Sequence, residues 1–236
     1  MKAKLDHIVH ENKAKTINSF WFEPEHPLDQ IAGQYIEMSI PHDKTDDRGT
    51  KRWFTISSSP SDAPLFSITT KFSRPSSTFK SALHKLKIGD SVSISDPMGD
   101  FVLPKDDTIP LIFVAGGIGI TPFHSIIKWL EDTKQSRDIT FLYAAKVEGE
   151  LIFLKLFEKY GMKRDILLSE PDDDWAGMTG QLSGKLIVEL ASPADNSLIF
   201  VSGPEQMVES LQTQLRGIGI DKARLVGDFF PGYGSL

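Results

Sequence analysis

Apolar and polar residues alternate in short runs through the first 104 positions of the chain. Residues that favour turns separate these runs, and several short strands at such spacing are typical of an antiparallel barrel or sandwich. The runs that predict strands are 4–9, 14–22, 34–40, 52–57, 65–70 and 91–96. One helix is expected among them, from Phe79 to Leu86, because Ser76-Ser77-Thr78 can cap its start and Gly89 follows its end.

Beyond Pro104 the pattern changes to alternating strands and helices. The predicted strands are 110–115, 138–145, 163–169, 197–202 and 223–229, and the predicted helices are 122–132, 150–160, 183–191 and 204–216. This alternation favours a parallel sheet with right-handed crossovers, in which ligands bind at the carboxyl ends of the strands. The sequence therefore predicts an antiparallel β-barrel domain over residues 1–104 and a parallel α/β domain over residues 105–236.

The segment from Arg52 to Pro60 combines groups that can bind a flavin nucleotide. Alternation along a strand sends Arg52 and Phe54 to one face and Trp53 and Thr55 to the other. A guanidinium can hold a pyrophosphate at two points, an aromatic ring can lie against an isoalloxazine, and a hydroxyl can hydrogen-bond the reactive ring nitrogen. An edge strand with an exposed arginine and turn-forming serines would explain the same residues.

Residues 109–122 form a second candidate site, with the sequence Ile-Pro-Leu-Ile-Phe-Val-Ala-Gly-Gly-Ile-Gly-Ile-Thr-Pro. A buried apolar strand enters a glycine-rich turn, after which Thr121 is the predicted cap and Pro122 the predicted first residue of a helix. Glycines let a ligand approach the backbone closely, and the amides at a helix start favour an anion. The spacing GGxGxTP differs from the GxGxxG dinucleotide pattern, so a phosphate-binding turn of another type is predicted.

Together and in this order, the two segments resemble those of the ferredoxin–NADP reductase family, in which a flavin-binding barrel precedes a nicotinamide-binding α/β domain. The family's flavin motif is usually written RxYS, and Arg52-Trp53-Phe54-Thr55 departs from it conservatively at two positions. Three more segments extend the resemblance over almost the whole chain. They are the barrel-end turn Pro97-Met98-Gly99-Asp100-Phe101, the CGP-x-x-M-like Ser202-Gly203-Pro204 with Met207, and the terminal acid-x-aromatic Asp228-Phe229-Phe230.

The resemblance implies that the first domain binds FAD, in preference to FMN. Arg52 would hold the flavin pyrophosphate, Phe54 would stack on the ring system, and Thr55 would hydrogen-bond near the reactive nitrogen. Trp53, on the same strand, is counted among the cofactor-binding residues. The phosphate site would be completed by Lys71, Ser76, Ser77 and Thr78. An ordinary serine cap on a connecting helix would explain the last three residues equally well.

In the second domain, the resemblance implies that the glycine-rich turn contacts a nicotinamide dinucleotide. The residues concerned are Gly116, Gly117, Gly119 and Thr121. Ser202 would take the place of the family's cysteine beside the nicotinamide, and Asp228 would be the acid that organises the site. With Thr55, these two residues are the expected catalytic set.

An aromatic side chain near the end of the chain covers the flavin face in relatives. The acid-x-aromatic register selects Phe230 for this role, and Tyr233 is close enough in sequence to be the alternative. A plain core role for Phe229 and Phe230 would also explain the pattern. Pro231 and the glycines beyond it would let such a tail swing aside.

The implied reaction is hydride transfer from NADH or NADPH to bound FAD, followed by one-electron transfer to an external ferredoxin, flavodoxin or oxygenase component. The acidic run Glu170 to Asp174 favours NADH, because NADPH carries an additional phosphate. Lys146, Lys163 and Arg164 could reverse that preference. Two alternatives stay open: a reductase that releases free flavin or reduces ferric iron, and a non-catalytic subunit that senses nicotinamide or transfers electrons only within a complex.

Composition narrows these possibilities. The formal net charge is −6 and no block of lysine and arginine occurs, so no electrostatic footprint for nucleic acid is expected. The 236 residues contain no cysteine, which excludes disulfides, thiolate zinc sites and a cysteine-ligated iron–sulfur cluster within them. The six histidines lack metal-binding spacing, so no metal is expected. Because the sequence shows no signal core and no membrane-length apolar run, a cytoplasmic location is expected. A monomer is also expected.

Overall fold

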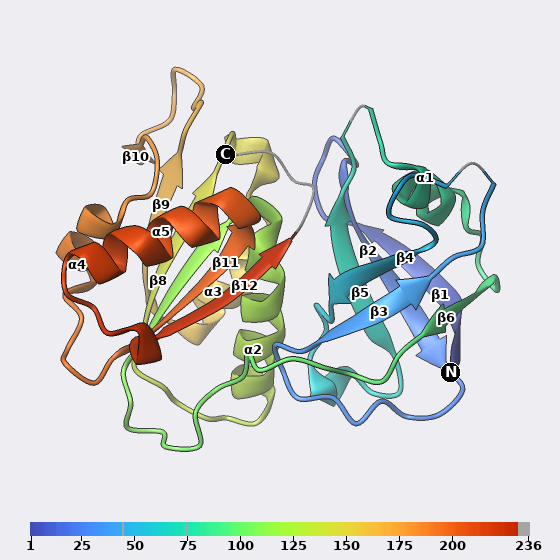
Figure 1. Ribbon diagram of the computed structural model, residues 1–236, viewed down its shortest axis with the longest axis horizontal. Helices are drawn as coiled ribbons and strands as arrows, with labels where there is room; N and C mark the ends of the chain where they lie inside the picture. Colours follow the sequence, from blue (N-terminus) through green and yellow to red (C-terminus); the bar gives the residue numbers. More distant parts are fainter. Residues whose placement is uncertain (44, 74, 231–236) are drawn as a thin grey trace.

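The computed structural model describes residues 1–43, 45–73 and 75–230, and this part of the chain forms two six-stranded sheets side by side (Figure 1). The first sheet is antiparallel, with the strand order β4-β3-β6-β1-β2-β5. Its elements are β1 (Lys2–His10), β2 (Ile17–Pro24), β3 (Tyr35–Ser39), β4 (Lys51–Thr55), β5 (Phe66–Lys71), helix α1 (Thr78–Lys85) and β6 (Ser91–Ile94). A bridge between Ile56 and Ile68 joins the two edges of the sheet and closes it into a barrel.

The second sheet is parallel, with the order β10-β9-β8-β7-β11-β12. Its strands are β7 (Leu111–Gly116), β8 (Ile139–Ala145), β9 (Lys163–Leu168), β10 (Met178–Thr179), β11 (Leu198–Pro204) and β12 (Leu225–Phe230). The helices between them are α2 (Thr121–Asp132), α3 (Leu154–Tyr160), α4 (Gly184–Ala191) and α5 (Glu205–Gly217). The structure therefore confirms the predicted fold class, an antiparallel β-barrel followed by a parallel α/β domain.

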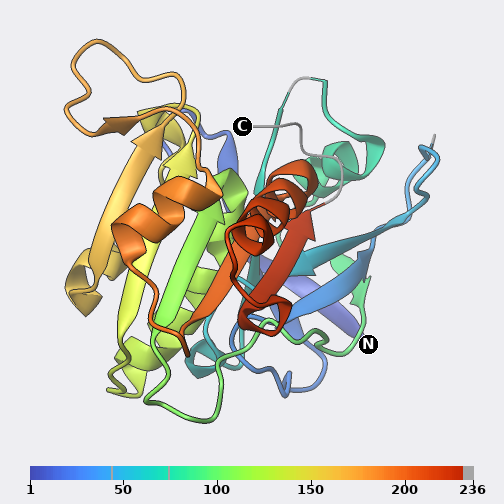
Figure 2. The ribbon, with the colours of Figure 1, turned by 60° about the vertical axis from the view of Figure 1, so that its left-hand side comes forward.

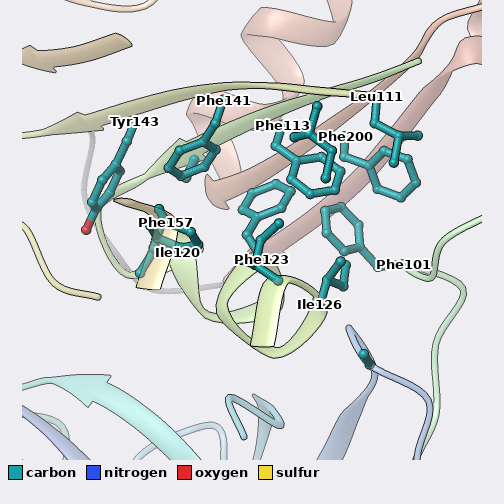
Figure 3. Close-up of a cluster of buried hydrophobic side chains, with 14 of the residues drawn as sticks. Phe101, Leu111, Phe113, Ile120, Phe123, Ile126, Phe141, Tyr143, Phe157 and Phe200 are labelled. Atoms are coloured by element: carbon teal, nitrogen blue, oxygen red, sulfur yellow. The ribbon is translucent and has the colours of Figure 1, made fainter. Parts of the chain in front are cut away.

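Strand β7 shows why helices cover both faces of the parallel sheet. Phe113 points toward α2 and α3 and packs on Phe123 of α2, with ring centroids 4.7 Å apart (Figure 3). The next residue, Val114, belongs to the cluster that includes Leu211 of α5. Successive side chains of a strand point to opposite faces, so an uninterrupted apolar run is buried on both sides. Figure 2 shows α4 and α5 in front of the sheet.

The two domains share part of one core. Ile17, Ala32 and Phe101 from the first 104 residues belong to the same buried cluster as α2 and α3. The Phe101 ring lies 5.4 Å from that of Phe123. Gly33, at φ 99°, permits this contact, because a Cβ there would lie 2.0 Å from the Phe101 carbonyl oxygen. The domains are thus held together in part by a shared apolar contact.

Local details differ from the sequence-based expectations at three places. The residues from Gly117 to Ile120 form a 3-10 turn, so Thr121 already lies inside α2 and Pro122 is its second residue. Helix α3 begins at Leu154, because a separate 3-10 turn occupies Glu148–Glu150. The two-residue strand β10 was too short to leave a periodic pattern. Among the described helices, none is both long and apolar enough to cross a bilayer.

Candidate functional site

A cavity of about 340 Å³ opens at the junction of the two domains. Its volume lies in the range of about 300–1,000 Å³ that is typical of small-molecule sites. The barrel contributes most of the wall, and the α/β domain contributes one side. The lining residues are Tyr35, Arg48, Arg52, Trp53, Phe54, Thr55, Thr69, Ser73, Pro75, Ser77, Lys80, Ile118, Gly227, Asp228 and Phe229. The predicted Arg52–Thr55 segment and Asp228 are therefore brought together, although they are far apart in sequence.

Arg52 lies in the cavity wall, with both terminal nitrogens of its guanidinium engaged by neighbouring protein groups. One terminal nitrogen, Nη2, donates to both carboxylate oxygens of Asp46, at 2.6 and 2.8 Å. The other, Nη1, donates to backbone carbonyls of the adjoining loop. The hydrogen bond from Arg52 lowers the pKa of Asp46 below its usual range. The polar loop at 43–50, interpreted from sequence as a solvated connection, thus takes part in the site.

Aromatic rings form the apolar part of the cavity. Phe54 is 8% exposed and packs on Phe79 of α1, with centroids 5.7 Å apart, while it also lines the cavity. Trp53 is 60% exposed, and its ring lies 6.1 Å from that of Tyr35. Because the two side chains of β4 both reach the lining, the strand end offers ring surfaces against which a planar heterocycle can stack.

Thr55 and Asp228 connect the two domains inside the cavity. The buried Thr55 hydroxyl donates to Oδ2 of Asp228 at 3.5 Å, the outer limit of a hydrogen bond. Burial raises the pKa of Asp228 to about 6, against the weaker opposing effects of the Thr55 hydroxyl and the Phe229 backbone amide. At neutral pH the carboxyl group is therefore close to its titration range and can exchange a proton.

The predicted phosphate site around α1 is only partly assembled at the cavity. Ser77 is the N-cap of α1, accepts a hydrogen bond from the Lys80 amide, and lines the cavity. The Thr78 hydroxyl accepts a hydrogen bond from the Asp46 backbone amide, and Thr78 does not line the cavity. Ser76 has a buried hydroxyl without a hydrogen-bond partner among the described residues.

Lys71 was predicted to bind phosphate, and in the structure its side chain lies away from the cavity. Its ammonium group pairs with Glu150 of the other domain at 2.5 Å and does not line the cavity. Lys80, one turn into α1, lines the cavity in its place. Lys71 is the last residue of β5, and its side chain reaches Glu150 of the neighbouring domain. Lys80 is therefore the lysine that lines the cavity, and the sequence reasoning missed it.

The glycines after β7 are required mainly by backbone packing. A Cβ on Gly119 would lie 2.2 Å from the Ser202 carbonyl oxygen, so the 3-10 turn rests directly on β11. Gly117 has φ 52°, and Gly116 ends β7. Thr121 is 1% exposed and donates its hydroxyl to the Ile118 carbonyl at 3.1 Å, and it is the first residue of α2 instead of its cap. Only Ile118 of this turn lines the cavity.

Ser202 lies behind the cavity wall. It pairs with Asp228 in the ladder between β11 and β12, but it does not line the cavity. Its side chain is fully buried, and its hydroxyl has no hydrogen-bond partner among the described residues. A buried hydroxyl without a partner carries a desolvation cost, so a group that enters this region would find a donor there.

A second cavity, of about 210 Å³, lies at the carboxyl ends of β8 and β9, beside α5. Its lining residues are Ala144, Ala145, Ser169, Gly180, Gln181, Leu182, Gln206, Met207, Ser210, Leu211 and Gln214. Glu170 follows Ser169, and its carboxylate pairs with Lys146 at 3.2 Å on the exposed surface. Lys146, a cation at this edge of the sheet, is thus already paired with Glu170, which begins the acidic run noted in the sequence.

The C-terminal aromatics are only partly within the described part of the structure. Phe229 lines the first cavity and is 47% exposed. Phe230 closes β12 opposite Pro204, but its side chain lies outside the described residues, as does the whole of Tyr233. The predicted cover over the flavin face is therefore not located by the structure.

Asp46, Lys80 and Tyr35 belong to the site and were not predicted. Asp46 lies in a loop with many charged residues. The sequence alone does not show which carboxylate of this loop pairs with Arg52 and which are solvated. Lys80 follows the Ser77 cap by three residues, which places it one turn into the helix and was a usable signal. Tyr35 pairs with Thr55 across β3 and β4, a register that sequence alone does not fix.

Comparisons with known proteins agree with this two-part arrangement. Residues 2–103 match the oxidoreductase FAD-binding domain family, and residues 113–213 match the oxidoreductase NAD-binding domain family. The chain is 28% identical over 211 residues to the glycine betaine monooxygenase reductase subunit of Chromohalobacter salexigens, a match that covers 86% of this chain and 54% of the relative. It is 26% identical over 241 residues to the stachydrine N-demethylase reductase subunit of Rhizobium meliloti, covering 97% and 67%.

Solved structures share the fold over nearly the whole chain. The FAD/NAD-binding domain of nitric oxide dioxygenase from Vibrio cholerae superposes with a TM-score of 0.80 at 23% identity, covering 97% of this chain and 98% of the other. A ferredoxin NADP+ reductase from Neisseria gonorrhoeae, with bound FAD and NADP, gives a TM-score of 0.78 at 16% identity, covering 97% and 98%. The chain spans about half the length, 54%, of the glycine betaine monooxygenase subunit.

Proposed function

Because the chain belongs to the ferredoxin–NADP reductase-like flavoprotein oxidoreductases, we propose that it takes hydride from a reduced nicotinamide, through FAD, and passes electrons to a separate protein acceptor. The observation that carries this proposal is the interdomain cavity, where Arg52, Phe54 and Thr55 of the barrel meet Asp228 of the α/β domain. We place the boundary between the domains at residues 104 and 105, between the end of β6 and the start of β7.

The residues of the cavity fit a flavin nucleotide. Arg52, Arg48 and Lys80 supply cations for a pyrophosphate, and Phe54 supplies an aromatic ring for a planar heterocycle. Thr55 supplies a hydroxyl near the other domain. When bound, a flavin supplies the ability to accept two electrons as hydride and release them singly. The protein binds, orients and shields the flavin, so the proposal requires no nucleophile.

Asp228 has a specific part in this proposal. Its pKa of about 6 leaves about a tenth of the carboxyl groups protonated at pH 7, so Asp228 can take up a proton and give it up to a neighbouring acceptor. Thr55 is the described hydroxyl that reaches Asp228, so the two form a short path for a proton between the domains. Ser202, paired with Asp228 in the next strand, would offer a hydroxyl beside the nicotinamide.

The acceptor is proposed to be a component of an oxygenase or a small electron-transfer protein. Several relatives are named as reductase subunits, among them those of glycine betaine monooxygenase and stachydrine N-demethylase. The 236 residues contain no cysteine, so a cysteine-ligated cluster cannot lie within them. The electrons would therefore leave this segment for a carrier on another segment or another polypeptide.

NADH is the proposed coenzyme. The second cavity lies beside Ser169, and the Glu170 carboxylate next to it would repel the additional phosphate of NADPH. Lys146 is paired with Glu170, Arg164 with Glu158, and Lys163 donates to the Leu190 carbonyl. The three cations that could have reversed the preference are therefore engaged with protein groups.

The test starts from the purified chain loaded with FAD and passed through a gel-filtration column. We expect FAD to be retained, and its visible absorbance to be bleached by about one equivalent of NADH without oxygen. Ferricyanide should then be reduced at the expense of NADH. Flavin that is lost on the column yet reduced in the presence of NADH would indicate a free flavin reductase. Retained FAD that NADH does not bleach would indicate a nicotinamide-sensing subunit.

A further inference from the structure

Helix α2 carries a row of polar side chains on the side that meets the barrel domain. His124, Lys128 and Asp132 are spaced four residues apart and therefore share one side of the helix, and Ser125 lies beside them. All four contact the segment 57–62, which follows β4. The function proposed above uses none of these contacts.

His124 makes the most specific of them. Its Nδ1 lies 2.6 Å from the carbonyl oxygen of Ser57. A carbonyl can only accept, so Nδ1 carries the proton and donates it. Burial lowers the pKa of His124 to about 4, so the ring is neutral at physiological pH. The ring stacks on Phe153 at a centroid distance of 3.8 Å, which fixes its plane.

Phe153 takes a strained conformation to make this stack. It has φ 63°, in the left-handed region, although it carries a bulky side chain. Such a residue persists where its surroundings require it, and it often does so near functional sites. Its position, directly before α3, places the ring over His124. The stacking therefore holds the His124 donor in the orientation that Ser57 needs.

Ser57 and Ser58 are held from both domains. The Ser125 hydroxyl, which is buried, donates to the Ser58 carbonyl at 2.6 Å. On the barrel side, the Ser57 hydroxyl lies 2.9 Å from that of Ser67 and 2.7 Å from that of Thr69, which lines the cavity. The backbone after β4 is thus the point where directional hydrogen bonds from the two domains meet.

We propose that His124 and Ser125 are positioning residues, which set the flavin-facing Thr55 relative to the nicotinamide-binding side of the cavity. Thr55 is the last residue of β4, and Ser57 follows it by two residues. The turn Gly117–Ile120, which includes Ile118 of the cavity wall, leads directly into α2, so the helix that holds Ser57 is continuous with that wall. The inference rests on the proposed function, because its consequence is the alignment of two bound cofactors.

The hydrogen bonds can set this alignment where apolar packing alone cannot. Contacts such as that of Phe101 with Phe123 tolerate small sliding, whereas a hydrogen bond weakens steeply with angle and distance. Transfer between two bound groups is sensitive to their placement, and an error of about 1 Å can lower the rate about a hundredfold. The Thr55–Asp228 contact, which spans the domains at 3.5 Å, would be displaced together with Ser57.

Two variants with different chemistry test the proposal. His124→Phe keeps a ring that can stack on Phe153 but loses the donor to Ser57, and Ser125→Ala loses the donor to Ser58. FAD affinity, measured by quenching of flavin fluorescence, should stay within about twofold, since neither residue lines the cavity. The rate of flavin reduction by NADH in anaerobic stopped flow should fall at least about tenfold. The long-wavelength charge-transfer absorbance that forms when NAD+ is added to the reduced protein should weaken, and Ser125→Thr should restore it.

Lys128→Gln is the matched control at the same interface. It removes the ion pairs of Lys128 with Asp62 and Asp132, so it should lower the melting temperature without changing the reduction rate or the charge-transfer absorbance. Unchanged rate and absorbance in both test variants, or an equal fall in Lys128→Gln, would overturn the positioning role. Should His124→Phe fail to fold, Ser125→Ala decides alone. A wild-type chain that holds no FAD, or holds FAD that NADH does not reduce, would instead overturn the proposed function on which the inference rests.

Discussion

Arg52 donates from a single nitrogen to both carboxylate oxygens of Asp46, at 2.6 Å to Oδ1 and 2.8 Å to Oδ2. Its other terminal nitrogen donates to the carbonyls of Arg48, Gly49 and Lys51. Both terminal nitrogens are thus engaged by protein acceptors. A pyrophosphate that binds them must replace Asp46, because the two anions compete for the same donors.

This competition predicts that Asp46→Asn strengthens FAD binding. The amide keeps the size of the side chain but lacks the negative charge that holds Arg52, so the dissociation constant should fall about tenfold. Titration of FAD fluorescence against protein measures it. Asp47→Asn removes the same charge from the same loop at an exposed position, and should leave the constant within about twofold. Weaker binding by Asp46→Asn would mean that Asp46 orients Arg52 for the phosphate instead of competing with it.

Arg52 and Lys71, both predicted to bind flavin phosphates, should now behave differently. Charge-assisted contacts to phosphate contribute about 1.5–3 kcal/mol, so Arg52→Ala should weaken FAD binding at least about tenfold. Lys71→Ala should leave FAD affinity unchanged, because its ammonium pairs with Glu150 outside the cavity. It should instead lower the melting temperature, since it leaves a largely buried carboxylate without its cation. The same fluorescence titration and a thermal melt separate the two roles, and equal losses of FAD affinity would contradict the assignment.

Asp228 predicts a dependence of stability on pH. Its folded pKa of about 6 lies above the ordinary value of 3.8, so between these values the folded state binds more protons than the unfolded state. Titration of Asp228 should therefore lower the free energy of unfolding as the pH rises through this window, by up to about 3 kcal/mol. His124 acts in the opposite direction over the same range, because burial lowers its pKa to about 4. Urea unfolding of FAD-free wild type and Asp228→Asn at pH 4.5 and 7 isolates the Asp228 contribution, and stability should rise more with pH in Asp228→Asn than in the wild type. A stability that rises equally with pH in both proteins would contradict the raised pKa.

Much of the fold was readable from the sequence because its signals are local. The apolar run from Leu111 to Gly116 is buried on both faces and could be recognised as a central parallel strand. The Ser77 cap fixed the start of α1 by a hydrogen bond within four residues. The prediction that Thr121 caps α2 was wrong. A Thr-Pro pair can also occupy the first two positions of a helix when a 3-10 turn precedes it.

The site was harder to predict where it depends on contacts between distant residues. Lys71 could be placed on β5, but its partner Glu150 comes from the other domain. Asp46 became part of the site only through the course of a loop, which no periodicity describes. His124 looked like one of several scattered histidines, and its role depends on Ser57 and Phe153 across the domain junction. Tertiary placement decides such roles, and a single sequence carries little information about it.

Coenzyme choice can be tested at Glu170. Its carboxylate flanks the second cavity and pairs with Lys146, so Glu170→Arg reverses the local charge and also frees Lys146 for a phosphate. The ratio of kcat/KM for NADPH to that for NADH should rise at least about tenfold. Asp195→Arg makes the same charge change at an exposed position after α4 and should leave the ratio unchanged. A wild-type preference for NADPH in these assays would contradict the electrostatic argument itself.

The aromatic side chains at the end of the chain predict a change in nicotinamide affinity. Phe229 lines the first cavity while 47% exposed, so its ring can be displaced at small cost when a nicotinamide enters. An aromatic stack contributes about 0.5–1.5 kcal/mol beyond burial, so Phe229→Ala should tighten NAD+ binding about twofold to tenfold while FAD stays bound. Difference absorbance of the flavin during NAD+ titration measures this. The sequence register selected Phe230, with Tyr233 as the alternative, so Phe230→Ala and Tyr233→Ala belong in the same series. The variant with the tightest NAD+ binding identifies the aromatic residue that covers the flavin face. If only Phe230→Ala tightens NAD+ binding, the sequence register is right. Phe229 then only forms part of the cavity wall.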